Sequence, residues 1–263
     1  MAEPRRGYRP PTVTPSELLP VLNRAADAVV DALEDWSEWG PSGKKEGQYS
    51  SDLAADAAAV KVLEAAGLGV LSEESGRHHA DREVVVVLDP LDGSTNASRG
   101  ISWWATSLCA VDSEGPAAAV VVDLVHGTRY EASRGGGARR DGHTLVAAGP
   151  WQLSEAFVGL SGLPPRHLGW KQFRALGASA LDLCAVADGR LDAFVDCSHD
   201  AHGPWDYMGA FLVCLEAGAS MVDAGGRDLV ALEHHARRTP VAAANGVLLE
   251  QLLDARAAAF ATD

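Results

Sequence analysis

The residues best suited to chemistry lie in the segment VLDPLDGSTN, residues 87–96. Asp89 ends an apolar run, and Pro90 bars the helical conformation at that aspartate before the chain turns at Asp92. A short helix begins after this turn, where a phosphate would be held by the backbone amides of Gly93, Ser94 and Thr95. Mg²⁺ prefers oxygen ligands and keeps several waters, so two carboxylates beside a phosphate site suit it. Taken alone, the segment fits equally well an Asx-type turn in which the aspartates accept local hydrogen bonds.

Two further acidic segments follow the same pattern. The pair Glu73-Glu74 comes directly after the apolar run 68–71, and adjacent acids are unfavourable unless a cation or solvent relieves them. Asp206 lies in Gly203-Pro204-Trp205-Asp206, directly before an apolar helical segment. Each segment also has a simpler interpretation, a solvated loop tip for the glutamates and a helix N-cap for Asp206.

The first half of the chain reads as two helices followed by a sheet. Thr14, Pro15 and Glu17 form a helix start, and the first helix is expected to run to about residue 39. A glycine-rich loop over 40–51 precedes a second helix over 52–66, with Asp56 on its first turns. Short runs of apolar and β-branched residues then predict strands over 68–71, 83–88, 105–111, 117–125 and 128–133.

Near Gly149-Pro150 the pattern changes to alternating helices and strands. We expect helices over 178–187, 207–217 and 247–260, and strands over 191–196, 220–223 and 240–244. The chain is therefore predicted to be an α/β protein with an N-terminal half, residues 1–150, that carries most of the acids. The C-terminal half, residues 151–263, carries Asp206 and the residues expected to meet the substrate.

Charge and composition exclude several classes of protein. The 263 residues carry a formal charge of −14 with scattered Lys and Arg, which argues against a nucleic-acid polymer as partner. Residues 1–11 are polar and basic without an apolar core, so we expect neither a signal peptide nor membrane association, but a cytoplasmic protein. The four cysteines lack Cys-x-x-Cys spacing, which favours buried thiols over disulfides or a zinc site.

The three acidic segments, in this order, resemble the inositol monophosphatase family within the lithium-sensitive, magnesium-dependent phosphatase superfamily. The likeness spans residues 44–245 and includes Glu216-Ala217-Gly218 after the Trp-Asp pair. Three ordered motifs are far more specific than any one of them. The resemblance implies a layered αβαβα sandwich of the inositol monophosphatase and fructose-1,6-bisphosphatase type, two to three Mg²⁺ ions per active site, and a homodimer.

Residue by residue, the resemblance implies a first Mg²⁺ site made of Glu73, Asp89, the Leu91 carbonyl and Ser94. It implies a second site made of Asp89, Asp92 and Asp206, while Glu73 helps to hold a third ion. Asp56 matches the aspartate that pairs with the hydroxyl residue at Ser94 to activate water, so the expected catalytic residues are Asp56, Glu73 and Ser94. Gly93, Ser94 and Thr95 match the phosphate-binding positions.

The substrate side is less well defined by the sequence. Asp196 matches a substrate-contacting acid, and the segment Gly177-Ala178-Ser179-Ala180 resembles the bacterial inositol-phosphatase pattern, which makes Ala178 a candidate contact. The loop 197–204 carries His199 and His202 and either forms part of the pocket or is a solvated loop. Two histidines without a third anchored ligand are weak evidence for zinc or manganese. The pair His234-His235 reads as exposed.

The expected function is a Mg²⁺-dependent phosphomonoesterase acting on a small phosphorylated metabolite. Inositol monophosphate or a similar polyol phosphate is the first choice by resemblance, with histidinol phosphate, a sugar phosphate or a nucleotide monophosphate as alternatives. A metal-dependent binding protein without activity is a more remote alternative, because every matched metal and water-activating position is filled.

Overall fold

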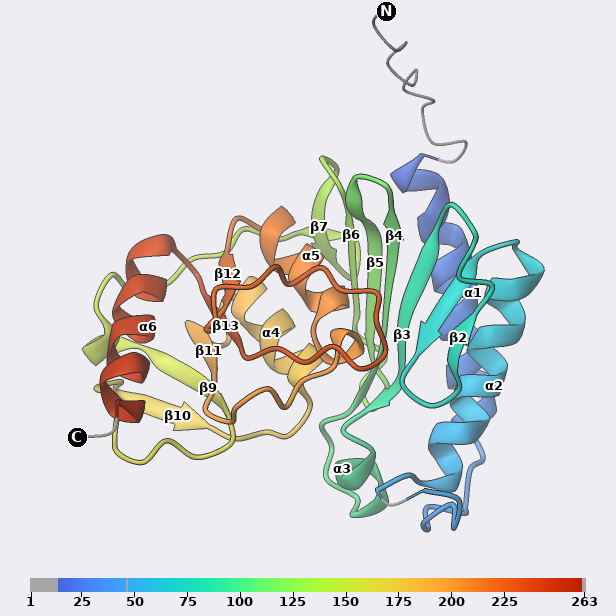
Figure 1. The fold of residues 1–263 in the computed structure, drawn as a ribbon, viewed down its shortest axis with the longest axis horizontal. Coiled ribbons are helices and arrows are strands. Elements are labelled where there is room, and N and C mark those ends of the chain that lie inside the picture. The colour runs from blue at the N-terminus through green and yellow to red at the C-terminus, as the bar shows by residue number, and fades with distance from the viewer. Residues whose placement is uncertain (1–13, 46, 262–263) are drawn as a thin grey trace, which may run out of the picture.

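Two mixed β-sheets alternate with three layers of helices in the computed structural model, which describes residues 14–45 and 47–261. Figure 1 shows α1 (Pro15–Leu33) and α2 (Ser50–Ala65) on the outer face of the larger sheet. Between the sheets lie α4 (Ser179–Ala187) and α5 (Met208–Glu216), and α6 (Gly246–Phe260) covers the far face of the smaller sheet. This order confirms the predicted αβαβα sandwich.

The larger sheet has eight strands in the order β2-β1-β3-β4-β5-β6-β7-β8. Its strands are β1 (Gly69–Ser72), β2 (Gly76–His78), β3 (Val85–Asp92), β4 (Ala105–Asp112), β5 (Gly115–Asp123), β6 (Arg129–Ser133), β7 (Gly137–Arg140) and β8 (His143–Thr144). All neighbours are antiparallel except β1 and β3, which run parallel. The parallel pair matters for function because both of its carboxyl ends lie at one edge.

The smaller sheet has five strands in the order β10-β9-β11-β13-β12. Its strands are β9 (Phe157–Ser161), β10 (Gln172–Arg174), β11 (Ala193–Asp196), β12 (Ser220–Asp223) and β13 (Pro240–Ala243). Strands β9 and β10 were not predicted. The side chains of β10 are exposed, so this strand has no apolar pattern in the sequence. No Gly, Pro, Asn or Asp marks a turn directly before β9, and the short helix η1 (Leu153–Glu155) precedes it instead.

The helices between the sheets share a core with both halves of the chain. One buried cluster joins Val87 and Tyr130 of the larger sheet to Leu181 of α4, Val213 of α5 and Phe194 of the smaller sheet. A second cluster fills the space between the larger sheet and α1 with α2, and a third lies between the smaller sheet and α6. The strands of the two sheets come from either side of residue 150, but this buried cluster contains residues from both sides. The division of the chain into two halves therefore stays a prediction.

The first helix ends at Leu33 rather than near residue 39, where the sequence had placed its end. Its N-terminus is as predicted, since the Thr14 amide donates to the Glu17 carboxylate at 2.8 Å. The segment after Leu33 brings three acids, Glu34, Asp35 and Glu38, to the negative end of the helix dipole, which disfavours further turns. Its two tryptophans, Trp36 and Trp39, pack instead against the core beside α1 and α2.

Within the described ranges, none of the helices has the length and apolar character needed to cross a bilayer. All four cysteines are free and buried, as predicted. Residues 1–11, whose composition argues against a signal peptide, lie outside the described residues.

Candidate metal centre

Two acids are brought together by the parallel pairing of β1 with β3. Ser72 pairs with Leu88, and the Glu73 amide donates to the Leu88 carbonyl at 3.1 Å, so Glu73 and Asp89 are the next residues on neighbouring strands. Both strands are fully buried up to this point, which fixes their register. The acids predicted at two strand ends therefore meet at one edge of the sheet.

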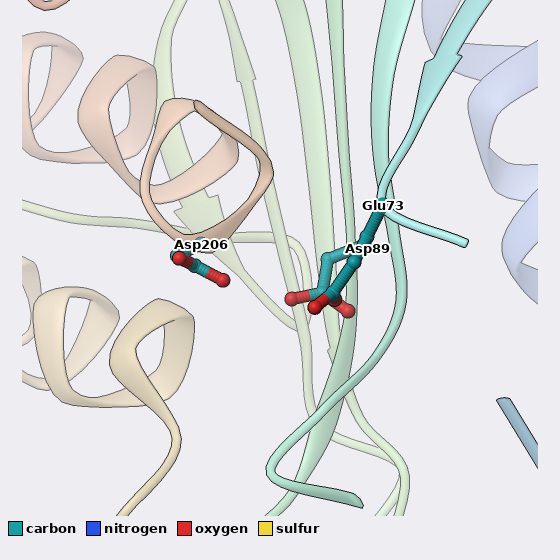
Figure 2. Close-up of side chains that lie close together, drawn as sticks. All are labelled: Glu73, Asp89 and Asp206. Carbon is teal, nitrogen blue, oxygen red and sulfur yellow. The ribbon is translucent and has the colours of Figure 1, made fainter. Parts of the chain in front are cut away.

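The third acid arrives from the second half of the chain. Asp206 ends the short helix η2 (Pro204–Asp206), and its Oδ2 accepts a 2.7 Å hydrogen bond from the Gly203 amide. One ligand atom from each of Glu73, Asp89 and Asp206 lies within 4.8 Å of the other two, and Figure 2 shows the three carboxylates facing the same space. Asp89 is buried, whereas Glu73 and Asp206 are half-buried.

Asp92 lies beside this group and is held from the other side. Strand β3 continues through Asp89-Pro90-Leu91-Asp92, with an irregular register against β4 between the two aspartates. This irregularity allows a proline within the sheet. Asp92 Oδ2 accepts a hydrogen bond of 2.7 Å from the Ala180 amide at the start of α4.

The carboxylates raise one another's pKa values. Burial raises the pKa of Glu73 well above its usual range, and the charges of Asp206, Glu74, Asp92 and Asp52 add to this effect. Burial also raises the pKa of Asp89, with further contributions from Glu73, Asp92 and Asp206. The pKa values of Asp92 and Asp206 are raised as well, again mainly by burial. The fold thus gathers carboxyl groups whose ionisation is disfavoured by burial and by one another's charge.

This donor set fits a hard divalent cation. Among the residues that the structure describes, no Lys or Arg forms an ion pair with Glu73, Asp89, Asp92 or Asp206. Carboxylates are the oxygen ligands that Mg²⁺ takes, and a cation within the group would offset the repulsion that raises their pKa values.

The turn after Asp92 packs too closely for any side chain larger than hydrogen at Gly93. Gly93 has φ +86° at the start of α3 (Ser94–Ser98), and a Cβ placed on it would lie 3.0 Å from the Ala178 Cβ and 3.1 Å from the Trp103 carbonyl oxygen. Ala178, a predicted substrate contact, is itself buried in this packing. The loop with Gly93, Ser94 and Thr95 is therefore fixed against the start of α4.

The water-activating acid was predicted at Asp56, paired with Ser94. In the described part of the chain, the recorded partner of Asp56 is instead the hydroxyl of Ser72. One turn earlier on α2, the buried Asp52 accepts from the Tyr49 amide at 2.9 Å, and its charge contributes to the raised pKa of Glu73. Burial, together with the charge of Glu74, raises the pKa of Asp52 to about 7. Sequence reasoning missed Asp52 because it was taken as the first residue of the helix, which begins at Ser50.

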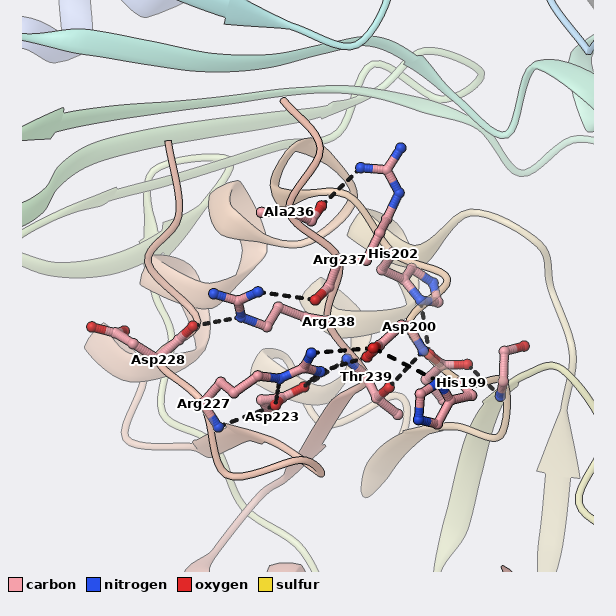
Figure 3. Close-up of polar contacts among 12 residues, drawn as sticks. His199, Asp200, His202, Asp223, Arg227, Asp228, Ala236, Arg237, Arg238 and Thr239 are labelled. Atoms are coloured by element: carbon pink, nitrogen blue, oxygen red, sulfur yellow. Dashed lines mark hydrogen bonds and ion pairs between the residues drawn. The ribbon is translucent and has the colours of Figure 1, made fainter. Parts of the chain in front are cut away.

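The two histidines of the loop 197–204 occupy different environments. His199 has a 94% exposed side chain beside Asp200, whose carboxylate pairs with Arg227 (Figure 3). His202 is buried, with Nδ1 at 3.0 Å from Asp196 Oδ2. Asp200, which lies between them in the chain, has φ +49°. Asp196 is fully buried, so its carboxylate is held by protein groups, and substrate contact by Asp196, His199 or His202 stays a prediction.

One histidine expected to be exposed contacts the metal centre. The half-buried His234 ring lies 4.8 Å from the Trp205 ring, and its Nε2 lies 3.1 Å from the Glu73 carbonyl oxygen. Arg237 lies over the same indole at 5.2 Å, and Figure 3 shows its guanidinium extending from the loop toward the larger sheet. The loop before β13 therefore covers one side of the site.

A cluster of carboxylates between a mixed sheet and a buried helix pair, in an αβαβα sandwich, is the architecture of a metal-dependent phosphatase. The chain belongs to the inositol monophosphatase family, whose model matches residues 42–260. Members of this family include phosphatases of the inositol monophosphatase and fructose-1,6-bisphosphatase type, which act on small phosphorylated substrates.

Individual relatives agree with this assignment. The chain is 34% identical over 209 residues to a fructose-1,6-bisphosphatase/inositol-1-monophosphatase of Thermococcus kodakarensis, covering 78% of this chain and 80% of the relative. It is 32% identical to the Nus factor SuhB of Xylella fastidiosa, with 68% and 70% covered. A solved structure from Pyrococcus horikoshii, described as similar to inositol-1 monophosphatase, superimposes with a TM-score of 0.79 at 25% identity and covers 91% of this chain and 96% of its own.

Proposed function

We propose that the protein is a Mg²⁺-dependent phosphomonoesterase in which Glu73, Asp89 and Asp206 hold the essential cation. The observation that supports this most directly is the approach of three carboxylates to within 4.8 Å in the fold of a phosphatase family. Among the described residues, none of the three forms an ion pair with Lys or Arg. Asp92, the Leu91 carbonyl and Ser94 complete two to three ion sites, by resemblance to the family.

Different residues of the chain would bind the substrate and activate the attacking water. Gly93, Ser94 and Thr95 lie at the start of α3 and would hold the phosphate through backbone amides. Asp52 or Asp56, together with Ser94, would orient the attacking water, and we favour Asp52 because its charge reaches Glu73. Bound Mg²⁺ would supply charge neutralisation at the phosphate and lower the pKa of water.

The substrate is proposed to be inositol monophosphate or a similar polyol phosphate. The names of the relatives support a polyol or sugar phosphate over the nucleotide and histidinol alternatives. A homodimer and lithium sensitivity are proposed on the family resemblance alone. A cytoplasmic location is proposed on the composition of the chain.

Release of inorganic phosphate from a panel of phosphorylated metabolites tests the proposal. The panel is inositol monophosphate, fructose 1,6-bisphosphate, histidinol phosphate and a nucleotide monophosphate, each assayed with Mg²⁺, with Mg²⁺ plus lithium, and with excess chelator. We expect turnover of a polyol or sugar phosphate that requires Mg²⁺ and falls with lithium. Full turnover in chelator would overturn the metal assignment, and no turnover of any ester would overturn the enzyme assignment.

A further inference from the structure

A chain of hydrogen bonds runs from the buried end of β11 to the start of α4. Asp196 Oδ1 accepts from the Ser198 amide at 2.8 Å, and its Oδ2 lies 3.0 Å from His202 Nδ1. His202 Nε2 lies 2.8 Å from the Ser179 hydroxyl. Asp196 is fully buried and His202 is 6% exposed, while Ser179 is half-buried. The chain thus ends at its more accessible member, the serine.

The bonding pattern determines what the serine can donate. The Asp196 carboxylate accepts, so His202 Nδ1 carries a hydrogen. When the imidazole is neutral, Nε2 accepts the Ser179 hydroxyl hydrogen. When it is protonated, Nε2 donates to Ser179 Oγ and the hydroxyl hydrogen is released for another acceptor. Within the described residues, His202 is the side-chain partner of that hydroxyl, so the released hydrogen would be available to a bound substrate.

Ser179 is next to the metal centre. It is the first residue of α4, and the amide of the following residue, Ala180, binds Asp92. The loop backbone at His202 is fixed as well, because its amide and carbonyl bond to Arg238 at 3.2 and 2.9 Å. We call the chain of hydrogen bonds from Asp196 through His202 to Ser179 the relay. It is held in place on one side by α4 and on the other by the segment before β13.

The charged groups that face His202 favour its protonated form. They are Asp196 from β11, Asp206 from η2, Asp92 from β3 and Asp182 from α4. Burial lowers the pKa of His202, but the hydrogen bond that it donates to Asp196 and the charges of Asp206, Asp196 and Asp92 outweigh burial and raise it overall. The proton-transfer role is inferred from the hydrogen-bonded path that leads from Asp196 through His202 to Ser179.

We propose that Ser179 donates a proton to the leaving oxygen of the substrate, that His202 resupplies it, and that Asp196 positions His202. This inference rests on the proposed phosphatase function. As the phosphorus–oxygen bond breaks, its electron pair goes to the leaving oxygen, which takes the Ser179 hydroxyl hydrogen. Ser179 Oγ takes the Nε2 hydrogen of the imidazolium, and neutral His202 regains a proton from solvent after the alcohol leaves.

Such a donor matters only for some leaving groups. An alcohol with a high pKa leaves as a strongly basic alkoxide, so proton donation lowers its barrier, typically by a factor of 10² to 10⁴ in rate. A nitrophenolate is stable without a proton and gains little. Dependence on the leaving group therefore separates proton donation from a role in holding the site together.

The test compares two substrates in one set of variants. Ser179→Ala and His202→Gln are assayed with inositol monophosphate, or with the alkyl phosphate that the wild type hydrolyses fastest, and with para-nitrophenyl phosphate. We expect kcat for the alkyl ester to fall about 100-fold in each variant. The loss of kcat for the nitrophenyl ester should be smaller by a factor of at least about ten. Ser179→Thr retains a hydroxyl and should restore much of the loss. His143→Ala, at an exposed side chain of β8 with no proposed role at the site, is the matched control.

Thermal melting with and without Mg²⁺ gives a readout independent of activity. The rise in Tm on adding Mg²⁺ should be the same for Ser179→Ala as for the wild type, because the relay does not hold the ion. Equal losses with both esters, or loss of the Mg²⁺-induced rise, would overturn the relay while the wild type stays active. A wild type inactive on every ester would overturn the phosphatase assignment, and the relay with it.

Discussion

The Ala180 amide donates to Asp92 Oδ2 at 2.7 Å, although the two residues are 88 positions apart in the chain. This bond joins the acidic turn of the first half to α4 of the second half. Asp206 makes the same connection through the metal centre, where it faces Glu73 and Asp89. The site is therefore completed only when both halves of the chain pack together around the shared core.

The repulsion within the acidic cluster predicts an unusual effect of Asp89→Asn on stability. Burial and the charges of Glu73, Asp92 and Asp206 all disfavour a charge at Asp89, so removing that charge should relieve the fold when no cation is present. We expect the variant to melt at or above the wild-type temperature in chelator, and to lose nearly all hydrolysis. The Leu91 amide can still donate to the asparagine oxygen.

The same experiment with Mg²⁺ provides the contrast. Wild type should be stabilised by about 2.7 kcal/mol when the free ion is a hundredfold above its dissociation constant. Asp89→Asn should gain little. A simple Asx turn at Asp89 predicts the reverse, a variant that is weaker in chelator and a protein indifferent to Mg²⁺. A destabilised variant that still hydrolyses substrate would contradict the metal-site assignment.

Asp52→Asn and Asp56→Asn distinguish the two candidate water-activating acids. The charge of Asp52 contributes to the raised pKa of Glu73, whereas Asp56 accepts from Ser72 within the buried face of α2. We expect kcat to fall about 100-fold in Asp52→Asn, with the Mg²⁺-induced rise in Tm retained. In Asp56→Asn the amide oxygen can still accept from Ser72, and we expect kcat within about threefold of wild type. Steady-state kinetics of both variants decide, and the opposite ranking would return the role to Asp56.

Gly93→Ala should destabilise the protein more than its backbone conformation alone requires. The positive φ costs about 1–2 kcal/mol for any residue with a side chain, and the added methyl would also press against Ala178 and the Trp103 carbonyl. Gly100→Ala is a matched control, because Gly100 has φ +69° and no atom within 4 Å of the added methyl. We expect at least about 2 kcal/mol more loss at Gly93 in denaturant unfolding. Equal losses would mean that the loop moves freely away from α4.

Local patterns in the sequence were enough to predict the acids at the strand ends. Glu73 and Asp89 each follow a short apolar run, and parallel pairing of those runs brings the acids together. The contribution of Asp206 could not be derived this way, because no local pattern indicates which distant helix start will face a given strand. Resemblance to the family placed Asp206 at the site, and the three-carboxylate group is consistent with that placement.

Other features depended on single backbone conformations that the sequence does not specify. His199 and His202 have the spacing of a common site, yet His199 is exposed and His202 is buried, and Asp200 between them has a positive φ. Asp52 was missed because the sequence placed it at the first position of α2, which begins at Ser50. Asp52 and Asp56 are four residues apart and share one face of the helix, so periodicity does not choose between them, and helix starts are uncertain by two residues from sequence alone.

A buried acid outside the cluster makes the stability depend on pH. Asp182 is 1% exposed, and burial raises its pKa to about 7 from 3.8, although the Trp103 indole donates to it at 2.9 Å. Because the folded state holds this proton more tightly than the unfolded state, the contribution of Asp182 to stability falls as the pH rises from about 4 to about 7. Above about pH 7 the Asp182 carboxyl is charged in both the folded and the unfolded state, so the loss of stability no longer changes with pH.

Asp182→Asn should remove this cost, because asparagine can accept from the Trp103 indole without carrying a charge. The variant and wild type should be about equally stable near pH 4, and the variant more stable by at least about 1 kcal/mol at pH 8.

Asp223→Asn is the control of opposite sign. Burial would raise the pKa of Asp223, but hydrogen bonds from Arg227 lower it overall, so its contribution is present above about pH 4 and is lost on acidification. That variant should therefore be less stable than wild type at pH 8, with the difference shrinking toward acid. Urea unfolding of the three proteins at several pH values measures both slopes, and a pH-independent difference for Asp182→Asn would show that this carboxyl is charged throughout.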